Sequence, residues 1–183
     1  MIILLCGLSG AGKTTLAMAV KHKLAESEIF IELIDADEYR QRLFKDLLYS
    51  KEDRNENIRR LGVIANKFSS HNIITIISAI NPYDEIRNEL VKSYKNVKIV
   101  HVDCPLAVLV KRDTKGLYKR ALLPSDDPQK INNLTGVNDP FEEPANPDLY
   151  INTYNLTIDE STNELYSFIM ENRYPLKKSV NHY

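Results

Sequence analysis

The sequence predicts an α/β fold in which helices flank a doubly wound, parallel sheet of five strands. Short apolar runs alternate along the chain with longer amphipathic segments. Several runs are apolar at both odd and even positions, as strands covered on both faces are. A hydrophobic content of 43% and a charged content of 27% in 183 residues are typical of one globular domain. In such sheets, ligands bind at the carboxyl ends of the strands.

The expected strands lie at 2–6, 29–34, 73–80, 97–102 and 149–152. Helical patterns lie at 13–26, 51–70, 82–94, 105–121 and 161–172. Ser50 to Asp53 predict the start of the second helix, because the aspartate can replace the glutamate of a capping box. From 122 to 147 the chain holds five of its eight prolines and little periodicity. We therefore expect a long lid segment near 115–147.

One domain is expected at 1–173, followed by a C-terminal tail at 174–183. The formal charge of −1 provides no basic field for nucleic acid or an anionic membrane, so any anion site must be local. No stretch reaches the roughly 18 apolar residues of a membrane span, and no signal peptide pattern is present. Cys6 and Cys104 fit neither a disulfide framework nor a metal site, which indicates reduced thiols. A cytoplasmic protein is expected.

The stretch GLSGAGKTT, residues 7–15, joins the first expected strand to the first expected helix. It matches the full phosphate-loop pattern, in which glycines let backbone N–H groups turn toward a nucleoside triphosphate. Lys13 would neutralise charge at the transferring phosphate, and the Thr14 hydroxyl would contact Mg²⁺. The loop alone does not distinguish a kinase from a GTPase or a motor. The residues expected to hold the nucleoside triphosphate are Gly7, Ser9, Gly10, Ala11, Gly12, Lys13, Thr14 and Thr15.

Two carboxylates, Asp35 and Asp37, follow the second expected strand. Residues i and i+2 of a strand lean to the same side, so both side chains are placed to face the crevice. Phosphoryl transfer uses one carboxylate to order Mg²⁺ or its water and another to orient the acceptor hydroxyl. A helix N-cap followed by a solvated acid fits the spacing equally well. Further on, Arg54 and Asn57 share one helix face, which alone favours a solvated, charged surface.

Six stretches occur along the chain in this order: GLSGAGKTT, LIDADEYR, KEDRNENIRRLG, ISAINPYDEIR, VDCPLAVLVKRDTKGLYKRA and LTGVNDPFEEPANPD. Together they resemble the adenylylsulfate (APS) kinases, which phosphorylate the 3′-hydroxyl of adenylylsulfate with ATP. The resemblance covers about residues 2–153, and its last two stretches are the specific ones, because general nucleotide kinases lack them. It implies a P-loop kinase fold, ATP with Mg²⁺, a nucleotide acceptor and a homodimer.

The resemblance also implies roles for single residues. Asp35 joins Thr14 at the metal, Asp37 holds the acceptor hydroxyl, and Lys115 is a mobile lysine that reaches the substrates. Lys13, Asp35, Asp37 and Lys115 are thus the expected catalytic residues, and Arg112 is expected against the ATP adenine. The expected acceptor-binding residues are Asp37, Arg40, Tyr49, Arg54, Asn57, Ile80, Asn81, Lys115 and Leu134.

Some positions depart from the family pattern. Asn81 replaces a serine on which some members have been proposed to carry a phosphate, and an amide cannot do so, which predicts direct in-line transfer. Tyr49 and Leu134 replace the two phenylalanines of the base clamp, which leaves one aromatic face for stacking. Ala36 and Glu38 alter the acceptor corner, where a glutamate would repel a sulfate unless it turns to solvent.

These departures leave a second acceptor open. A same-family kinase acting on cytidine diphosphoramidate would offer a phosphoramidate nitrogen as a hydrogen-bond donor to Glu38, whereas sulfate offers only acceptors. A nucleotide-dependent switch that binds without transferring is the alternative from another class of protein.

Overall fold

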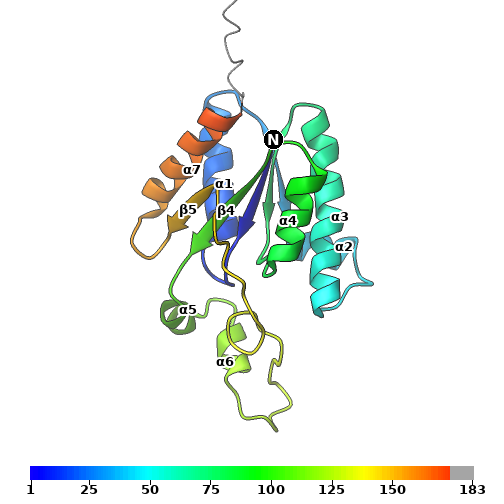
Figure 1. Ribbon diagram of the computed structural model, residues 1–183. Helices are drawn as coiled ribbons and strands as arrows, with labels where there is room; N and C mark the ends of the chain where they lie inside the picture. Colours follow the sequence, from blue (N-terminus) through cyan, green and yellow to red (C-terminus); the bar gives the residue numbers. More distant parts are fainter. Residues whose placement is uncertain (174–183) are drawn as a thin grey trace, which may run out of the picture.

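Five parallel strands form the centre of the computed structural model, which describes residues 1–173 (Figure 1). The strand order is β2-β3-β1-β4-β5, so the connections run to one side of β1 and then to the other. This reversal at β1 confirms the predicted doubly wound sheet, and it places a crevice at the carboxyl ends of the central strands. The strands are β1 (Ile2–Cys6), β2 (Ile31–Asp35), β3 (Ile74–Ser78), β4 (Val97–Asp103) and β5 (Leu149–Asn152).

Helices cover both faces of the sheet. Helices α1 (Lys13–Glu26) and α7 (Ile158–Asn172) pack on one face, and α3 (Lys51–Ser70) and α4 (Asp84–Ser93) on the other (Figure 1). Alternate residues of β1 belong to different cores: Ile3 lies in the core under α1, and Leu4 lies in the core under α3. Burial on both faces explains why the strand sequences lack a polar alternation.

Helix α3 begins where the capping box predicts. The Ser50 hydroxyl accepts a hydrogen bond from the N–H of Asp53 at 3.1 Å, and the Asp53 carboxylate accepts one from the N–H of Ser50 at 3.2 Å. Several other boundaries shift by a few residues, since β2 begins at Ile31, β3 spans Ile74–Ser78, and α7 begins at Ile158.

One helix prediction was wrong. The segment 105–121 is not one helix but two, α5 (Leu106–Arg112) and α6 (Leu117–Ala121). Between them Asp113 and Gly116 have φ angles of 26° and 66°, and the Asp113 carboxylate accepts hydrogen bonds from the N–H groups of Tyr118 and Lys119. A short helix, α2 (Ala36–Arg42), follows β2, as the helix N-cap alternative for Asp35 predicts.

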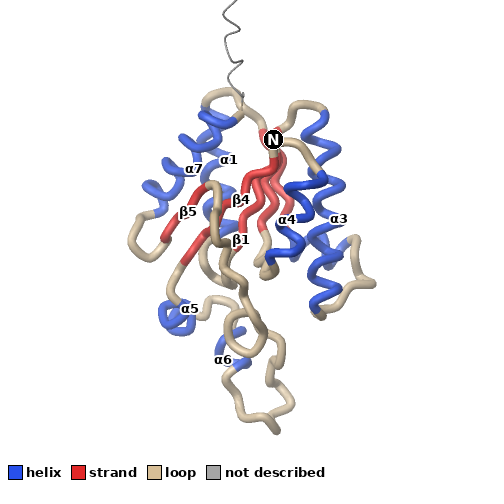
Figure 2. Tube along the Cα trace, viewed as in Figure 1, coloured by secondary structure: helices blue, strands red, loops and turns tan. Residues whose placement is uncertain are grey.

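Helix α6 and the first part of the irregular chain from 122 to 147 extend beyond the carboxyl end of the sheet, and the chain then returns along the sheet to β5 (Figure 2). The base of this segment is fixed, because the N–H of Glu142 donates to the carbonyl of Pro82 at 2.8 Å. The guanidinium of Arg87, which is 0% exposed, donates to the carbonyl of Glu142. The movement of this segment as a lid stays a prediction. The expected tail at 174–183 lies outside the described residues.

Candidate active site

The phosphate loop turns between β1 and α1 at glycines with left-handed backbone. Gly10 and Gly12 have φ angles of 77° and 96°, which side-chain-bearing residues rarely adopt. A Cβ atom at Gly7 would lie 2.1 Å from the carbonyl oxygen of Val102. The loop therefore requires glycine on steric grounds, and its backbone can approach a phosphate closely.

A cavity of about 240 Å³ lies over this loop at the carboxyl end of the sheet. We call it the phosphate cavity. Residues from the loop, from the end of β2, from β3 and from the α5–α6 connection form its wall. They are Ser9, Gly10, Gly12, Lys13, Thr14, Thr15, Asp35, Asp37, Ser78, Ala79, Ile80, Thr114 and Lys115.

Lys13 is buried at the edge of the phosphate cavity, with 8% of its surface exposed. Its ammonium donates hydrogen bonds to the carbonyl oxygens of Gly7 at 2.8 Å and Leu8 at 2.7 Å. Burial lowers the pKa of Lys13 to about 8, because the charged form loses its hydration. The loop thus holds one cation at the point where a phosphate chain adds negative charge.

Oxygen ligands for a hard cation gather beside Lys13. The Thr14 hydroxyl donates to a carboxylate oxygen of Asp35 at 2.9 Å and lies 3.1 Å from the Ser78 hydroxyl. Mg²⁺ prefers oxygen ligands and usually takes only one or two carboxylates from the protein, so this donor set fits the ion. Residues 1–173 contain no cluster of three or more His, Cys, Asp or Glu side chains with metal-binding geometry.

Asp35 is both a helix N-cap and a carboxylate beside Thr14, the two positions that the sequence left open. Its carboxylate caps α2 by accepting from the N–H groups of Asp37 at 3.0 Å and Glu38 at 3.3 Å, while its other oxygen faces Thr14. Asp37 lies in the first turn of α2 rather than on the strand, so the strand-alternation argument for it was wrong. Both carboxylates nevertheless line the phosphate cavity.

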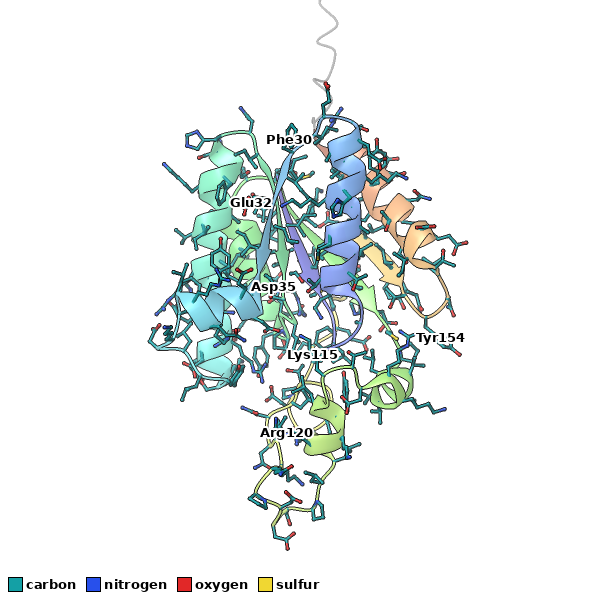
Figure 3. All side chains as sticks on the ribbon, turned by 180° about the vertical axis from the view of Figure 1, so that it is seen from behind. Phe30, Glu32, Asp35, Lys115, Arg120 and Tyr154 are labelled. Carbon is teal, nitrogen blue, oxygen red and sulfur yellow. The ribbon has the colours of Figure 1, made fainter. Side chains whose placement is uncertain are left out.

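The ammonium of Lys115 lies 3.3 Å from a carboxylate oxygen of Asp37. Figure 3 shows Lys115 beneath Asp35 at the carboxyl end of the sheet. Both groups of the Lys115–Asp37 pair are largely exposed, at 59% and 68%. An exposed ion pair of this kind is weak and exchanges readily for other partners.

A second cavity of about 480 Å³ adjoins the first, and we call it the acceptor cavity. It shares Ser9, Asp37, Ile80 and Lys115 with the phosphate cavity. Six lining residues are absent from the sequence prediction. They are Gln41, Leu117, Arg120, Ile131, Asn133 and Thr135. The predicted acceptor residues that line the same cavity are Asp37, Tyr49, Arg54, Ile80, Lys115 and Leu134.

Arg54 holds a tightly packed position rather than a solvated one. Its side chain is 10% exposed, and it donates to the carbonyls of Tyr49 at 3.0 Å and Asn133 at 2.6 Å. The guanidinium groups of Arg40 and Arg54 lie 5.0 and 5.6 Å from the centre of the Tyr49 ring. The acceptor-cavity wall formed by residues 1–173 includes Tyr49 but not Arg40. Arg40 therefore affects this cavity only through its contact with the Tyr49 ring.

The amides of Asn57 and Asn81 are buried, with 3% and 2% of their surfaces exposed. Within residues 1–173, the Asn57 Oδ1 atom, both amide atoms of Asn81 and the Thr135 hydroxyl have no hydrogen-bond partner. Buried polar groups are normally paired, so these groups are suited to receive one. Asn81 has a φ angle of 49°, a conformation that asparagine adopts more readily than serine.

Arg112 lies at a third cavity of about 240 Å³, on the α7 side of the phosphate loop. The wall includes Gly10 and Thr15 of the loop and Leu156 and Ile158 before and within α7. This hollow adjoins the phosphate cavity through shared loop residues and lies apart from the acceptor cavity. The position is compatible with the expected contact between Arg112 and the adenine of ATP, which stays a prediction.

Three features define a P-loop kinase. They are the glycine loop between β1 and α1, the cation and oxygen ligands over this loop, and the adjoining cavity with a carboxylate at the junction. The sequence profile described as adenylylsulphate kinase matches residues 1–152. The chain belongs to this family.

Individual relatives agree with this assignment. A probable adenylyl-sulfate kinase of Pseudomonas aeruginosa is 41% identical over 180 residues, which cover 96% of this chain and 82% of the relative. An adenylyl-sulfate kinase of Gloeothece citriformis is 44% identical over 163 residues, covering 89% and 90%. The structure of a Mycobacterium tuberculosis APS kinase in complex with AMPPNP and APS has a TM-score of 0.84 at 33% identity and covers 92% of this chain and 96% of that one.

Proposed function

We propose that this protein is an ATP-dependent adenylylsulfate kinase. It transfers the γ-phosphoryl group of ATP to the 3′-hydroxyl of adenylylsulfate and produces 3′-phosphoadenylylsulfate and ADP. The observation that carries the proposal is the junction of the two cavities at Asp37 and Lys115. A kinase needs its phosphoryl donor and its acceptor to meet at one point, and the names of the relatives supply the acceptor.

The phosphate cavity binds ATP. Backbone N–H groups of the loop and the N-terminus of α1 receive the phosphate oxygens, and Lys13 balances charge on the transferring group. Thr14 and Asp35 are the residues that would hold Mg²⁺, which when bound neutralises charge on the phosphate oxygens. Arg112 contacts the adenine on the far side of the loop.

The acceptor cavity binds the second nucleotide. Asp37 orients the 3′-hydroxyl and takes its proton as the hydroxyl oxygen forms a bond to the γ-phosphorus. The bond from that phosphorus to the bridging oxygen breaks, and ADP leaves with the electron pair. Lys115, which reaches Asp37, balances charge on the moving phosphoryl group. Tyr49 stacks on the base, while Arg54 faces the anionic tail.

We expect direct transfer, because Asn81 has an amide where the members proposed to carry a phosphate have a serine hydroxyl. Incubation with γ-labelled ATP should therefore leave no label on the protein after denaturation. Label that stays on the denatured chain would contradict direct transfer without contradicting the kinase activity.

Glu38 does not favour the cytidine acceptor. Its carboxylate lies 3.3 Å from Arg42 and is 54% exposed, and the walls that residues 1–173 give the two cavities do not include Glu38. Glu38 would therefore not repel a sulfate bound in the acceptor cavity. It also would not accept a hydrogen bond from a phosphoramidate nitrogen there. The remaining feature in favour of another base is Leu134 in place of an aromatic residue.

The test compares kcat/KM for adenylylsulfate and cytidine diphosphoramidate under the same conditions. We expect the adenylyl compound to have the higher value. The variant Asp37→Ala should abolish turnover and leave ATP binding largely unchanged, since Asp37 serves the acceptor. A higher kcat/KM for the cytidine compound would contradict the assignment of adenylylsulfate as the acceptor. A wild-type protein that releases no ADP with any nucleotide acceptor would favour a switch that binds nucleotide without transferring phosphate.

We also propose that the protein is a single domain over 1–173, forms a homodimer and acts in the cytoplasm. Family membership supports the homodimer and the location. Residues 1–173 contain no helix that is long and apolar enough to cross a membrane. Sedimentation of the purified protein at several concentrations tests the dimer, and a monomer at all of them would contradict it.

A further inference from the structure

We infer that Arg60 is a positioning residue for the acceptor, because it fixes the segment 43–50 that carries Tyr49 into the acceptor cavity. This inference rests on the proposed function, in which Tyr49 stacks on the acceptor base. Arg60 acts through Asp46 and makes no contact with substrate.

The segment 43–50 connects α2 to α3 and has little apolar anchorage. Leu47 is buried at 9% exposure, but Leu43 and Leu48 are 63% and 69% exposed. Arg40 donates to the carbonyl of Leu48, and Arg54 donates to the carbonyl of Tyr49. Arg54 lines the acceptor cavity and Arg40 contacts the ring of Tyr49, so substrate binding draws on the same groups that hold the end of the segment.

Arg60 holds the middle of the segment independently of the substrate. Its two terminal nitrogens donate to the two carboxylate oxygens of Asp46 at 2.9 and 2.8 Å. Its guanidinium also lies 5.4 Å from the centre of the Phe44 ring. Arg60 follows Arg54 by six positions, or roughly 9 Å of helix rise, and the acceptor-cavity wall formed by residues 1–173 does not include it.

A wider ion-pair network supports this contact. Glu56 accepts from Arg60 at 2.9 Å and from Arg59 at 2.6 Å, and Arg59 also donates twice to Glu89 of α4. Hydrogen bonds from the two arginines lower the pKa of Glu56, and the hydrogen bond from Arg60 lowers the pKa of Asp46. An isolated surface pair contributes little, but a bidentate pair within a network holds a defined geometry.

Arg59 and Arg60 provide a matched pair for the test. Each makes a two-nitrogen contact with one carboxylate, but Arg60 holds the Tyr49 segment and Arg59 holds α4. Replacement by lysine keeps the charge and removes the planar fork. We expect Arg60→Lys to raise the KM for adenylylsulfate by about three- to tenfold, a partial loss of base stacking, with kcat and the KM for ATP nearly unchanged. Arg59→Lys should leave all three near wild type.

A double-mutant cycle links the effect to the Asp46 contact. Asp46→Asn should raise the acceptor KM by a similar factor, and adding Arg60→Lys should raise it no further, because both changes remove one contact. Multiplied effects in the double variant would overturn the inference, as would equal effects of Arg59→Lys and Arg60→Lys.

A fluorescence measurement tests the same point without turnover. The chain contains no tryptophan, so Tyr49→Trp introduces a single reporter. Adding Arg60→Lys should lower the anisotropy of that reporter and increase its quenching by acrylamide, whereas adding Arg59→Lys should change neither. An unchanged anisotropy with Arg60→Lys overturns the inference, whereas an inactive wild type with the expected anisotropy change overturns only the proposed function.

Discussion

Lys13 is a buried cation whose environment changes when a triphosphate binds. Its ammonium contacts two backbone carbonyls of the loop, and burial lowers its pKa to about 8. The negative charges of a bound triphosphate favour the protonated form and raise the pKa again. Between the two pKa values, the complex holds a proton that the free protein lacks, so ATP binding takes up a proton there.

At about pH 9, binding of ATP or a non-hydrolysable analogue should take up close to one proton per site, since the free lysine is then mostly neutral. The uptake should fade below about pH 7, and the affinity should decrease as the pH rises above about 8. Calorimetry in buffers of different ionisation enthalpy measures the uptake. The variant Lys13→Met serves as the control, and equal uptake by variant and wild type would assign the proton to another group.

Leu134 is the residue that we propose to lie against the acceptor base together with Tyr49. It is 6% exposed and lines the acceptor cavity together with Tyr49. A second aromatic face would add stacking of about 1–3 kcal/mol, which crowding of a buried position offsets in part. We expect Leu134→Phe to lower the acceptor KM by about fivefold, and Leu134→Met, which adds no ring, to leave it unchanged. A higher KM for Leu134→Phe at unchanged stability would contradict the stacking role.

At the scale of elements, the start of α3 depends on a small number of side chains. Ser50 and Asp53 cap the helix reciprocally, directly after Tyr49, the residue proposed to stack on the base. Removal of an N-cap hydroxyl costs about 1 kcal/mol of stability, so Ser50→Ala should lower the free energy of unfolding by that amount. Urea denaturation measures it, with Ser93→Ala at the exposed end of α4 as a control expected within about 0.5 kcal/mol of wild type.

The cap of α3 is an example of a boundary that the sequence predicts well. At α3, a capping box and a helical repeat mark the same boundary, so the prediction and the structure coincide. At 105–121 the helical pattern continues through Asp113, whereas the backbone there turns left-handed and its carboxylate starts a new helix. Helix α2 has only seven residues, too few for its periodicity to stand out. Interruptions and short helices depend on contacts that a repeat pattern does not contain.

At the scale of the whole molecule, the active site joins three distant parts of the chain. The loop around Lys13 and the acids after β2 have local sequence signatures, and the structure brings them together as predicted. The acceptor wall at Ile131 and Asn133 comes from the irregular segment, where no repeat indicates which residues face inward. Gln41 follows Asp37 by one helical turn, so recognition of α2 would have predicted it.

The irregular segment is anchored to the rest of the fold at two points. The guanidinium of Arg87 donates to the carbonyl of Glu142, and that of Arg54 donates to the carbonyl of Asn133. The first residue of the segment, Leu122, is 59% exposed. A lid that closes over the reacting groups would exclude water from the γ-phosphate. Since Leu117 and Arg120 of α6, which leads into this segment, line the acceptor cavity, closure should require the acceptor nucleotide as well as the donor.

Amide hydrogen exchange tests this closure. The amides of 122–131 should exchange more slowly when an ATP analogue and adenylylsulfate are both bound, and remain close to the free rate with the ATP analogue alone. Peptides from 165–172 in α7 serve as the internal control, because that part of the helix packs on the sheet away from the acceptor cavity and from the cavity at Arg112. Equal protection by the ATP analogue alone would place the closing contacts on the donor side, and no protection with both nucleotides would show that the segment is a fixed wall rather than a lid.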